Sequence, residues 1–525
     1  MDYRYTRVLA AWACFFCSLQ APTASAQVRV TTYHNDNFRT GLNFAETLLN
    51  PLNVNHIQFG KLFTQSVDGY VYAQPLYLPN VSIPGRGTHN AVFVATEHDS
   101  VYAFDADSNS GSNATPLWKV SFINPLAGIT TVPNNDAACY DIVPEIGITG
   151  TPVIDASSGT LYVVAKTKEN GSYVQRLHAL SVSTGAEKFG GPVEIQASAP
   201  GTGLGGNGTT ITFDPLLANQ RPGLLLQSGV VYIGWAGHCD GGPYHGWLLA
   251  YNGGTLAQLG VFNSTPNGIR GGFWAAGAAP AADSFSNIFV ATGNGTFDGA
   301  GDFADSMLKL KLGSSLQRED YFTPFNQGAL NVLDADLGSG GILLLPDQPG
   351  AHPHLLVQAA KEGKIYLIDR DNMGGFNFAG DTQIVQSIPY SVGGMWSMAA
   401  YWNNALYFLG SGDVLRGFLL NNGLISTTPF AMGNTAFGFP GATASISAQG
   451  NANGIAWVLQ TDQFGVKGRA ILRAYNATNL VELYNSDQSS RRDSPGPAVK
   501  FTVPTVVNGK VYVGTETGLS VYGLR

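Results

Sequence analysis

Charged side chains are scarce in this sequence. Lys, Arg, Asp and Glu make up 12% of the 525 residues, about half of the roughly 25% that is usual in globular proteins. The 28 basic residues are outnumbered by 36 acidic ones, which gives a formal net charge of −8 at pH 7. Without a basic stripe the chain lacks the cations that displace counterions from phosphates. We therefore expect neither nucleic acid nor an anionic membrane as a partner.

Several short enzyme motifs are absent as well. The sequence contains no Cys-x-x-Cys-His, which excludes a covalently attached c-type haem. It has no Gly-x-Ser-x-Gly turn and no phosphate-cradling loop. The glycine-rich run Gly201–Gly206 is not followed by a helical pattern, so we interpret it as a flexible loop and not as a dinucleotide fingerprint.

The apolar run at the amino end of the chain is short. Arg4 and Arg7 precede the apolar stretch Val8–Leu19, and Ala24-Ser-Ala26 follows it. A charged start, a short apolar centre and an Ala-x-Ala exit are typical of a cleavable secretory signal, and twelve apolar positions are too few to span a bilayer. We predict a signal peptide at residues 1–26 and a secreted or periplasmic mature chain.

What the sequence does contain is a repeated pair of β-rich runs. In each copy a short apolar run ends in a small or polar turn, and a second run closes on a tyrosine or a similar side chain. The eight copies start 50 to 70 residues apart, at Ala91, Thr160, Val230, Asn287, His354, Ala405, Ile455 and Lys510. A period of about 50 residues with several short strands is typical of a β-propeller. We predict an all-β, eight-bladed β-propeller over residues 57–525, preceded by a lead-in segment at 27–56.

The ring also has to close. The last copy supplies only three strand-like runs before the chain ends, whereas Phe59–Ser66, near the mature start, is an unpaired run of the right length. We predict that this N-terminal strand completes the last blade, because closure hides edges that otherwise invite aggregation. We expect the closed ring to be a monomer.

Cys139 and Cys239 are the two cysteines outside the predicted signal peptide. Each lies in a polar loop beside an aspartate, and an exported chain meets an oxidising compartment in which thiols can pair. We predict a disulfide that bridges adjacent blades over the central pocket, with two free thiols as the alternative.

The turn after the first copy carries a family pattern. Ala103-Phe-Asp105, Gly111 and Trp118 follow the Ala-x-Asp-x-x-Thr-Gly-x-x-x-Trp turn in which a flat aromatic side chain covers the neighbouring blade. In this the chain resembles the quinoprotein propellers, the family of pyrroloquinoline-quinone (PQQ) alcohol dehydrogenases, over roughly its whole mature length. The resemblance implies PQQ and a Ca²⁺ or lanthanide ion as cofactors, and a small molecule or carbohydrate as ligand.

Three loops resemble the metal and base loops of that family. Ile288–Asn294 is similar to the strand whose final asparagine binds the metal, and Leu333–Gly338 lies where the family has the Trp-Asp-Tyr loop of the catalytic base. The loop after Gly234 resembles the family's Gly-Ala-Glu loop. The resemblance implies metal ligands at Asp240, Asn294 and Asp336, and a catalytic base at either Asp334 or Asp336. Oxygen ligands of this kind suit a hard cation, and a carboxylate can accept the hydroxyl proton of an alcohol.

The quinone-contacting positions match less well. By resemblance Lys361 takes the place of a quinone-contacting arginine, Trp274 that of the tryptophan on one quinone face, and Cys139 that of one of two adjacent cysteines on the other. Here only one cysteine is present, and Trp274 is a few positions out of register relative to Asn294. We expect a ligand-binding or scaffold propeller with a polar axial pocket that has lost the full quinone site. The alternative is a PQQ- and metal-dependent dehydrogenase of an alcohol or sugar.

Further polar residues are candidates for the pocket. Glu145 precedes an inner strand, so we predict that it faces the axis. His238, Asp240 and His245 are ligand types that suit a transition metal, with a hydrogen-bonded loop as the alternative. A sugar-cleaving or lyase propeller that uses Glu145, Asp240 or Asp336 is a third candidate function, although no paired-carboxylate spacing supports it.

Overall fold

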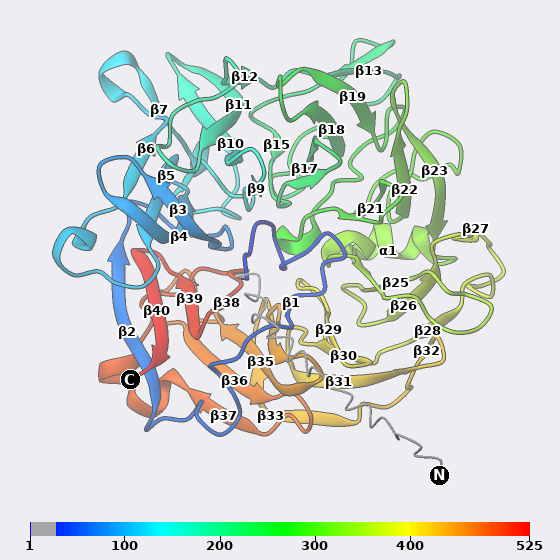
Figure 1. Ribbon diagram of the computed structural model, residues 1–525. Helices are drawn as coiled ribbons and strands as arrows, with labels where there is room; N and C mark the ends of the chain where they lie inside the picture. The colour runs from blue at the N-terminus through cyan, green and yellow to red at the C-terminus, as the bar shows by residue number, and fades with distance from the viewer. Residues whose placement is uncertain (2–27) are drawn as a thin grey trace.

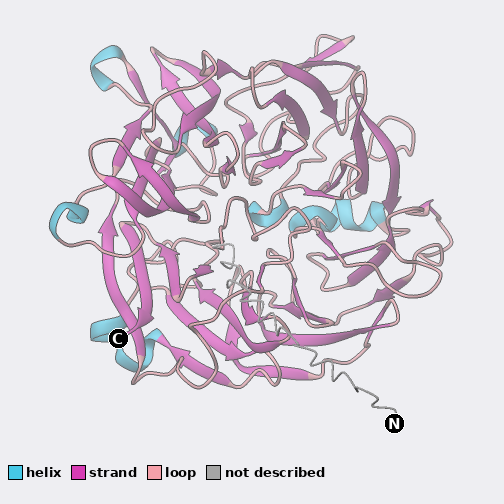
Figure 2. Cartoon of the chain, in the orientation of Figure 1, coloured by secondary structure: helices cyan, strands magenta, loops and turns pink. Residues whose placement is uncertain are grey.

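Eight sheets radiate from one axis in the computed structural model (Figure 1), and strands dominate the chain (Figure 2). The structure describes Met1 and residues 28–525, so the predicted signal peptide lies, apart from Met1, outside the described residues. In the described part, no helix is long and apolar enough to cross a membrane. The eight-bladed propeller predicted from the repeat period is confirmed.

The first four blades follow the chain in order. Blade 1 contains β3 (Leu76–Ile83), β4 (Gly87–Thr96), β5 (Ser100–Asp105) and β6 (Trp118–Ser121). Blade 2 contains β7 (Ile129–Pro133), β8 (Glu145–Ile146), β9 (Val153–Asp155), β10 (Thr160–Glu169), β11 (Ser172–Ser181) and β12 (Val193–Glu194). Blade 3 contains β15 (Ala218–Asn219), β16 (Leu225–Gln227), β17 (Val230–Gly237), β18 (Trp247–Asn252) and β19 (Gln258–Asn263). Blade 4 contains β20 (Ala281–Ala282), β21 (Asn287–Ala291), β22 (Met307–Leu312), β23 (Leu316–Thr323) and β27 (Gly375–Phe376).

The remaining four blades complete the ring. Blade 5 contains β24 (Leu343–Leu344), β25 (Leu355–Ala359), β26 (Ile365–Asp369) and β28 (Gln386–Ile388). Blade 6 contains β29 (Ala400–Trp402), β30 (Ala405–Phe408), β31 (Asp413–Asn421), β32 (Leu424–Ile425) and β33 (Ala431–Phe437). Blade 7 contains β1 (Leu42–Asn43), β34 (Ser445–Gln449), β35 (Ala452–Gln460), β36 (Ile471–Asn476) and β37 (Glu482–Asn485). Blade 8 contains β38 (Thr505–Val507), β39 (Lys510–Gly514), β40 (Gly518–Leu524) and β2 (Phe59–Ser66).

Three further elements lie between the blades. A separate hairpin is formed by β13 (Ser198–Pro200) and β14 (Thr210–Thr212), and the two α-helices of the described chain are α1 (Gln327–Leu333) and α2 (Ser490–Asp493).

The residue pattern of a strand reflects its place in the blade. All residues of β17 except the first are buried, whereas the outer strand β33 alternates between partly buried and exposed residues. The reason is that blades cover both faces of β17, while one face of β33 meets water.

The ring is closed by the N-terminal strand, as predicted. β2 pairs antiparallel with β40, from Phe59 opposite Leu524 to Ser66 opposite Gly518. In Figure 1 this is the blue strand beside the red one. Phe59 is fully buried and its ring lies 5.0 Å from that of Tyr484. The first strand of the fold thus covers the edge that the last strand leaves open.

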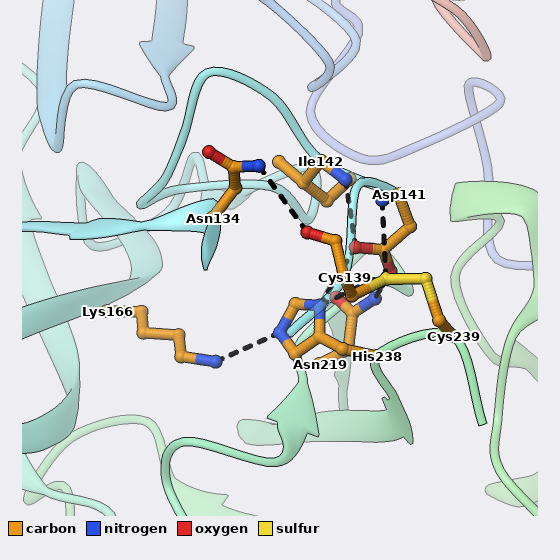
Figure 3. Close-up of a disulfide and its surroundings, with 8 residues drawn as sticks. All are labelled: Asn134, Cys139, Asp141, Ile142, Lys166, Asn219, His238 and Cys239. Atoms are coloured by element: carbon orange, nitrogen blue, oxygen red, sulfur yellow. Dashed lines mark hydrogen bonds and ion pairs between the residues drawn. A yellow bond between two sulfur atoms is a disulfide. The ribbon is translucent and has the colours of Figure 1, made fainter. Parts of the chain in front are cut away.

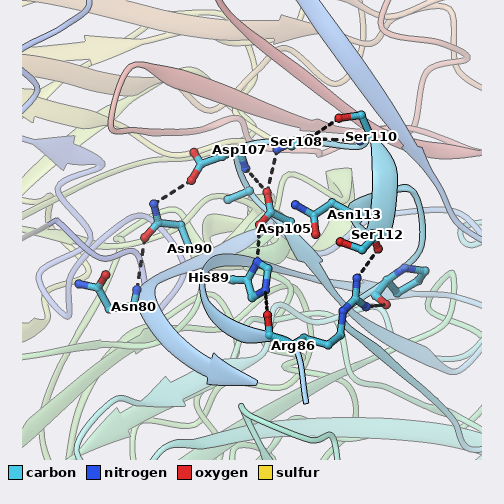
Figure 4. A network of polar contacts seen from close by, with 12 residues as sticks. Asn80, Arg86, His89, Asn90, Asp105, Asp107, Ser108, Ser110, Ser112 and Asn113 are labelled. Carbon is cyan, nitrogen blue, oxygen red and sulfur yellow. Dashed lines mark hydrogen bonds and ion pairs between the residues drawn. The ribbon is translucent and has the colours of Figure 1, made fainter. Parts of the chain in front are cut away.

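Neighbouring blades are joined by polar contacts of the repeat. In the turn after β5 (Figure 4), the Asp105 carboxylate accepts hydrogen bonds from the backbone N–H groups of Asp107 and Ser108, at 2.9 and 2.8 Å. Trp118, which follows this turn, donates its indole N–H to Val182 O in blade 2 at 2.8 Å. The predicted docking of this aromatic side chain on the next blade is confirmed.

The tyrosines of the repeat make a second kind of junction. In three copies the tyrosine hydroxyl donates to a backbone carbonyl of the following blade, at 2.8 to 3.0 Å: Tyr162 to Gly253, Tyr407 to Ala477 and Tyr512 to Ala106. A buried hydroxyl needs such a partner. The last of the three contacts crosses the ring closure.

The lead-in segment crosses the axis and bonds to every blade (Figure 1). Its backbone groups and asparagine side chains form hydrogen bonds, in chain order, with Tyr77, Ile154, Leu226, Ala282, Leu344, Tyr401, Ile446 and Val506. At its centre the guanidinium of Arg39 is buried and donates to Pro280 O, Tyr33 O and Thr32 Oγ1. The segment therefore fastens the eight inner strands to one another.

Candidate functional site

One cavity with a volume of about 280 Å³ lies among the loops that lead into and out of the inner strands. Its acidic side is lined by Asp240, Asp334 and Asp336, together with Lys361 and Trp274. The rest of its wall is lined by Asp141, Ile142, Asn219, Arg221, Cys239, Ala276, Ser339, Trp396, Phe439, Lys500 and Phe501. These residues come from loops of blades 2 to 8, so ring closure assembles the site.

Asn294 forms hydrogen bonds with all three aspartates of the acidic side. It follows β21, is 1% exposed, and donates its backbone N–H to Asp336 Oδ1 at 2.6 Å. Its side-chain Nδ2 donates to Asp240 Oδ2 at 3.1 Å and to Asp334 Oδ1 at 2.9 Å. Its Oδ1 is buried and has no hydrogen-bond partner among the described residues. One asparagine therefore contacts three carboxylates from two other loops, and its Oδ1 has no partner in the described chain.

Gly293 explains why this loop carries a glycine before the asparagine. A Cβ at this position would lie 2.7 Å from Asp336 Oδ1 and 2.8 Å from Cδ1 of Trp274, which is closer than side chains pack. Any other residue would push the carboxylate and the indole away from the backbone.

Asp334 and Asp336 follow α1 and differ in exposure. The Asp336 side chain is 6% exposed and pairs with Lys361 Nζ at 2.6 Å, whereas the Asp334 side chain is 64% exposed and lies 3.2 Å from the same ammonium. Burial raises the pKa of the Asp336 carboxyl, and the nearby Lys361 ammonium opposes that rise. Asp334 is thus the carboxylate that an entering molecule meets first.

Asp240 completes the acidic side from the loop between β17 and β18. It accepts a hydrogen bond from the Tyr244 hydroxyl at 2.5 Å and lies 3.8 Å from Arg270 Nη1. Burial, reinforced by the Asp240 charge, raises the pKa of Tyr244 well above its usual value. Tyr244 therefore remains a hydrogen-bond donor to Asp240 at any ordinary pH.

Aromatic rings form the side walls of the cavity. Trp274 packs edge-on against Tyr244, with ring centroids 6.3 Å apart, and its indole N–H has no partner among the described residues. Trp396 lies edge-on to Phe439 at 5.1 Å, and Phe439 in turn lies 6.1 Å from Phe501. Flat walls of this kind suit a planar ligand.

The predicted disulfide is confirmed (Figure 3). Cys139, in the loop before β8 of blade 2, is bonded to Cys239, in the loop after β17 of blade 3, and the two Cα atoms are 5.8 Å apart. Cys239 lines the cavity. Two cysteines far apart in the sequence thus bring a disulfide to the pocket, even though the chain lacks adjacent cysteines.

A chain of polar side chains runs from the disulfide loop into the protein interior (Figure 3). Asp141, on the cavity wall, lies 3.1 Å from His238 Nδ1, and Lys166 Nζ lies 3.0 Å from His238 Nε2. Burial lowers the pKa of Lys166 to about 7, although Asp141 opposes this effect. Burial, and then the nearby Lys166, lower the pKa of His238. The histidine is therefore neutral at physiological pH.

The structure separates some residues that the sequence grouped together. His238 contacts Asp141, Asp240 contacts Asn294, and His245 contacts Thr265 and Leu204, so the three do not share a transition-metal site. The alternative of hydrogen-bonded loops describes them. Within the described chain, Cys139, Asp141 and His238 are the one group of three acidic, histidine or cysteine ligands within 4.8 Å. There the sulfur is already bonded to Cys239.

Glu145 does not line the cavity. Its carboxylate accepts hydrogen bonds from Thr131 and faces His98 Nδ1 at 2.8 Å. Four residues that do line the cavity were not predicted from the sequence: Arg221, Trp396, Lys500 and Phe501. They lie in irregular loops between strands, where the chain has no periodicity to mark them.

Similarity to known proteins is found in the fold and not in the sequence. No family model and no curated protein matches the sequence. Among solved structures, the quinohemoprotein alcohol dehydrogenase from Comamonas testosteroni superposes with a TM-score of 0.60 at 14% identity, covering 95% of this chain and 80% of that one. A europium-containing methanol dehydrogenase superposes with a TM-score of 0.59 at 13% identity, covering 94% of this chain and 98% of that one. At such identities the likeness shows the quinoprotein-like fold, and function rests on the site.

Proposed function

We propose that the axial cavity is the active site of an oxidoreductase that uses PQQ and an oxygen-ligated cation to oxidise an alcohol or sugar. The observation that carries the proposal is the arrangement around Asn294, whose amide touches Asp240 and Asp334 and whose backbone touches Asp336. Asp240, Asp334 and Asp336 line a cavity with aromatic walls, and Asn294 is hydrogen-bonded to all three.

The residues present suit a hard cation. Carboxylates and an amide oxygen are the ligands that Ca²⁺ and lanthanide ions prefer. The buried Oδ1 of Asn294 has no partner in the described chain, and a bound cation would supply one. Asp240, Asn294 and Asp336 are the proposed metal ligands. Trp274 and the Cys139–Cys239 disulfide are the proposed contacts of the quinone, and Lys361 is a further candidate contact.

When bound, the quinone supplies the acceptor for the hydride that leaves the alcohol carbon. The chain itself has to remove the hydroxyl proton. We assign this to Asp334, because its side chain is 64% exposed while that of Asp336 is 6% exposed and paired with Lys361. Lys361 holds both aspartates in place, at 3.2 and 2.6 Å.

The test measures cofactor binding and turnover separately. PQQ binding is followed by equilibrium dialysis with and without Ca²⁺ or La³⁺, and turnover by dye reduction with a panel of alcohols and aldoses. Asp334→Asn is expected to reduce turnover by about a hundredfold or more, the usual contribution of a general base, with little effect on PQQ binding. Asp347→Asn, an exposed aspartate in blade 5, is the control. Dye reduction that Asp334→Asn leaves unchanged would contradict the assignment.

A second function is supported by the ion pair of Lys361. Its ammonium pairs with both Asp334 and Asp336 and offsets part of their negative charge without a metal, as expected for a ligand-binding or scaffold propeller that has lost the full quinone site. That function predicts ligand binding without a cation and no dye reduction under any of the conditions above. In either case the disulfide supports export to an oxidising compartment, and we propose that the protein acts there as a monomer.

A further inference from the structure

The wall of the cavity away from the three aspartates carries two cations without acidic partners. Arg221 is 5% exposed, lines the cavity, and its Nη2 has no hydrogen-bond partner in the described chain. Lys500 also lines the cavity. Neither forms an ion pair within 4.0 Å with any described carboxylate. A buried guanidinium without a carboxylate or phosphate partner is costly, so its partner has to come from elsewhere.

Aromatic rings hold both cations at the cavity wall. The guanidinium of Arg221 lies 4.4 Å from the centroid of the Phe501 ring and 5.8 Å from that of Tyr72. The Lys500 ammonium lies 5.5 Å from the same Phe501 ring and 5.2 Å from that of Phe464. Both cations therefore contact the same Phe501 ring, an interaction that leaves their N–H groups free to form hydrogen bonds.

The acids nearest to these cations form no ion pair with them. Asp141 is hydrogen-bonded to His238 and Asn219, and its charge attracts Lys500 from beyond ion-pair distance. Glu97 accepts hydrogen bonds from Gly147 and Thr149, and burial raises its pKa to about 8 even though Arg221 opposes this. Glu97 is thus largely uncharged at neutral pH and does not neutralise the arginine.

We propose that Arg221 and Lys500 form an anion subsite that binds a carboxylate of the cavity ligand. The guanidinium matches a carboxylate with two parallel hydrogen bonds, and the ammonium adds a second charge beside it. The aspartates at the opposite side repel a carboxylate, so the two sides together orient the ligand. The ligand class is a planar aromatic carboxylate, with its anionic group toward blades 3 and 8 and its other end toward Asn294.

This inference deepens the proposed function by assigning the anionic end of the ligand, but its test needs neither quinone nor cation. The probes are naphthalene-2,3-dicarboxylate, which carries both anionic groups at one end, and the neutral naphthalene-2,3-dimethanol, titrated in EDTA by calorimetry. The wild type is expected to bind the dicarboxylate more tightly than the dimethanol. Arg221→Met is expected to weaken dicarboxylate binding by about tenfold or more, the effect of losing a charge-assisted hydrogen bond, and to leave dimethanol binding unchanged.

Two further variants separate charge from structure. Lys500→Met is expected to weaken dicarboxylate binding by a smaller factor, because a single ammonium makes no paired contact. Lys510→Met is the control, in a distant part of blade 8, where the lysine pairs with Asp107 from the turn after β5. This variant is expected to bind like the wild type. Arg221→Lys keeps the charge and tests whether a loss of affinity comes from misfolding, with the thermal midpoint measured for each variant.

The outcomes are distinguishable from those of the proposed function. Selective dicarboxylate binding that depends on Arg221, in a protein that shows no quinone-dependent dye reduction, supports the anion subsite and rejects the oxidoreductase. Equal binding of both probes by the wild type, or equal loss of both in Arg221→Met at an unchanged thermal midpoint, overturns the anion subsite whatever the dye assay shows.

Discussion

Lys166 Nζ lies 3.0 Å from Nε2 of His238, in a fully buried position behind the cavity wall. The ammonium also donates to the backbone carbonyls of Leu216 and Ala218. Burial lowers the pKa of Lys166 from 10.5 to about 7. Burial therefore destabilises the charged form of this lysine relative to the neutral form.

This arrangement predicts how stability depends on pH. Above pH 7 the folded protein has released the Lys166 proton, while the unfolded chain keeps it up to about pH 10.5, so the unfolded state binds more protons in this window. The stability contributed at this site is therefore lowest below pH 7 and rises toward pH 10.5, with a slope of at most about 1.4 kcal/mol per pH unit.

The measurement compares urea unfolding of the wild type and of Lys166→Met between pH 6 and 10. The unfolding free energy of the wild type is expected to rise relative to that of the variant as the pH increases. His238, Asp141, Asp214, Glu97 and Asp99 also act on this lysine, so the difference between the two proteins is used and not either curve alone. Lys311→Met, at an exposed position of β22, serves as the control. A difference that does not change with pH contradicts the prediction.

The disulfide links two loops that are 100 residues apart in the sequence. In the chain-entropy account, a loop of this length stabilises the fold by up to about 4 to 5 kcal/mol. We expect a reductant to lower the urea midpoint of the wild type and to have no effect on the Cys139→Ser/Cys239→Ser double variant, which starts from the lower midpoint. Equal midpoints for the oxidised wild type and the double variant would show that the bond does not stabilise the fold.

Closure of the ring predicts a large effect at one phenylalanine. Phe59 is 0% exposed and packs against Trp457, Tyr484 and Tyr522. Phe59→Ala is expected to lower the unfolding free energy by about 3 to 5 kcal/mol, the usual cost of removing a buried ring. Leu62→Ala, in the same strand but 38% exposed, is the control and should cost much less. Similar losses for both variants would mean that β2 does not close the ring through Phe59.

The fold could be predicted because every blade of a propeller imposes the same residue pattern on the sequence. Each blade has to bury both faces of its inner strands, and this leaves the same apolar runs, with a tyrosine or a similar side chain, eight times along the chain. Phe59–Ser66 could be predicted as the closing strand because an eighth blade with three strands leaves one edge open. Pairing of Cys139 with Cys239 could be predicted because the other two cysteines lie within the predicted signal peptide.

The cavity was only half predictable. Asp240 and Asn294 follow strand ends and Asp336 follows α1, in loops that resemble a known pattern, and both aspartates contact Asn294 in the structure. Arg221 and Lys500 lie in irregular connections, and nothing in their local sequence marks the axis. Glu145 was a candidate for the pocket, but its carboxylate contacts His98 and Thr131 and it does not line the cavity. Irregular loops of this kind are positioned by tertiary contacts that a local pattern does not encode.

The acidic side of the cavity predicts which cation it prefers. Asp240, Asp334 and Asp336 are all hydrogen-bonded to Asn294, and each carboxylate attracts a trivalent ion more strongly than a divalent one. We expect La³⁺ to bind at least about tenfold more tightly than Ca²⁺, a difference of about 1.4 kcal/mol. The measurement is competition with Tb³⁺, whose luminescence is sensitised by nearby tryptophan.

Asp336→Asn is expected to weaken La³⁺ binding more than Ca²⁺ binding, since it removes a full charge and keeps an oxygen. Asp371→Asn, at an exposed position of blade 5, should change neither. Tighter binding of Ca²⁺ than of La³⁺, or equal losses for both ions in Asp336→Asn, would contradict the assignment of Asp240 and Asp336 as ligands of one cation.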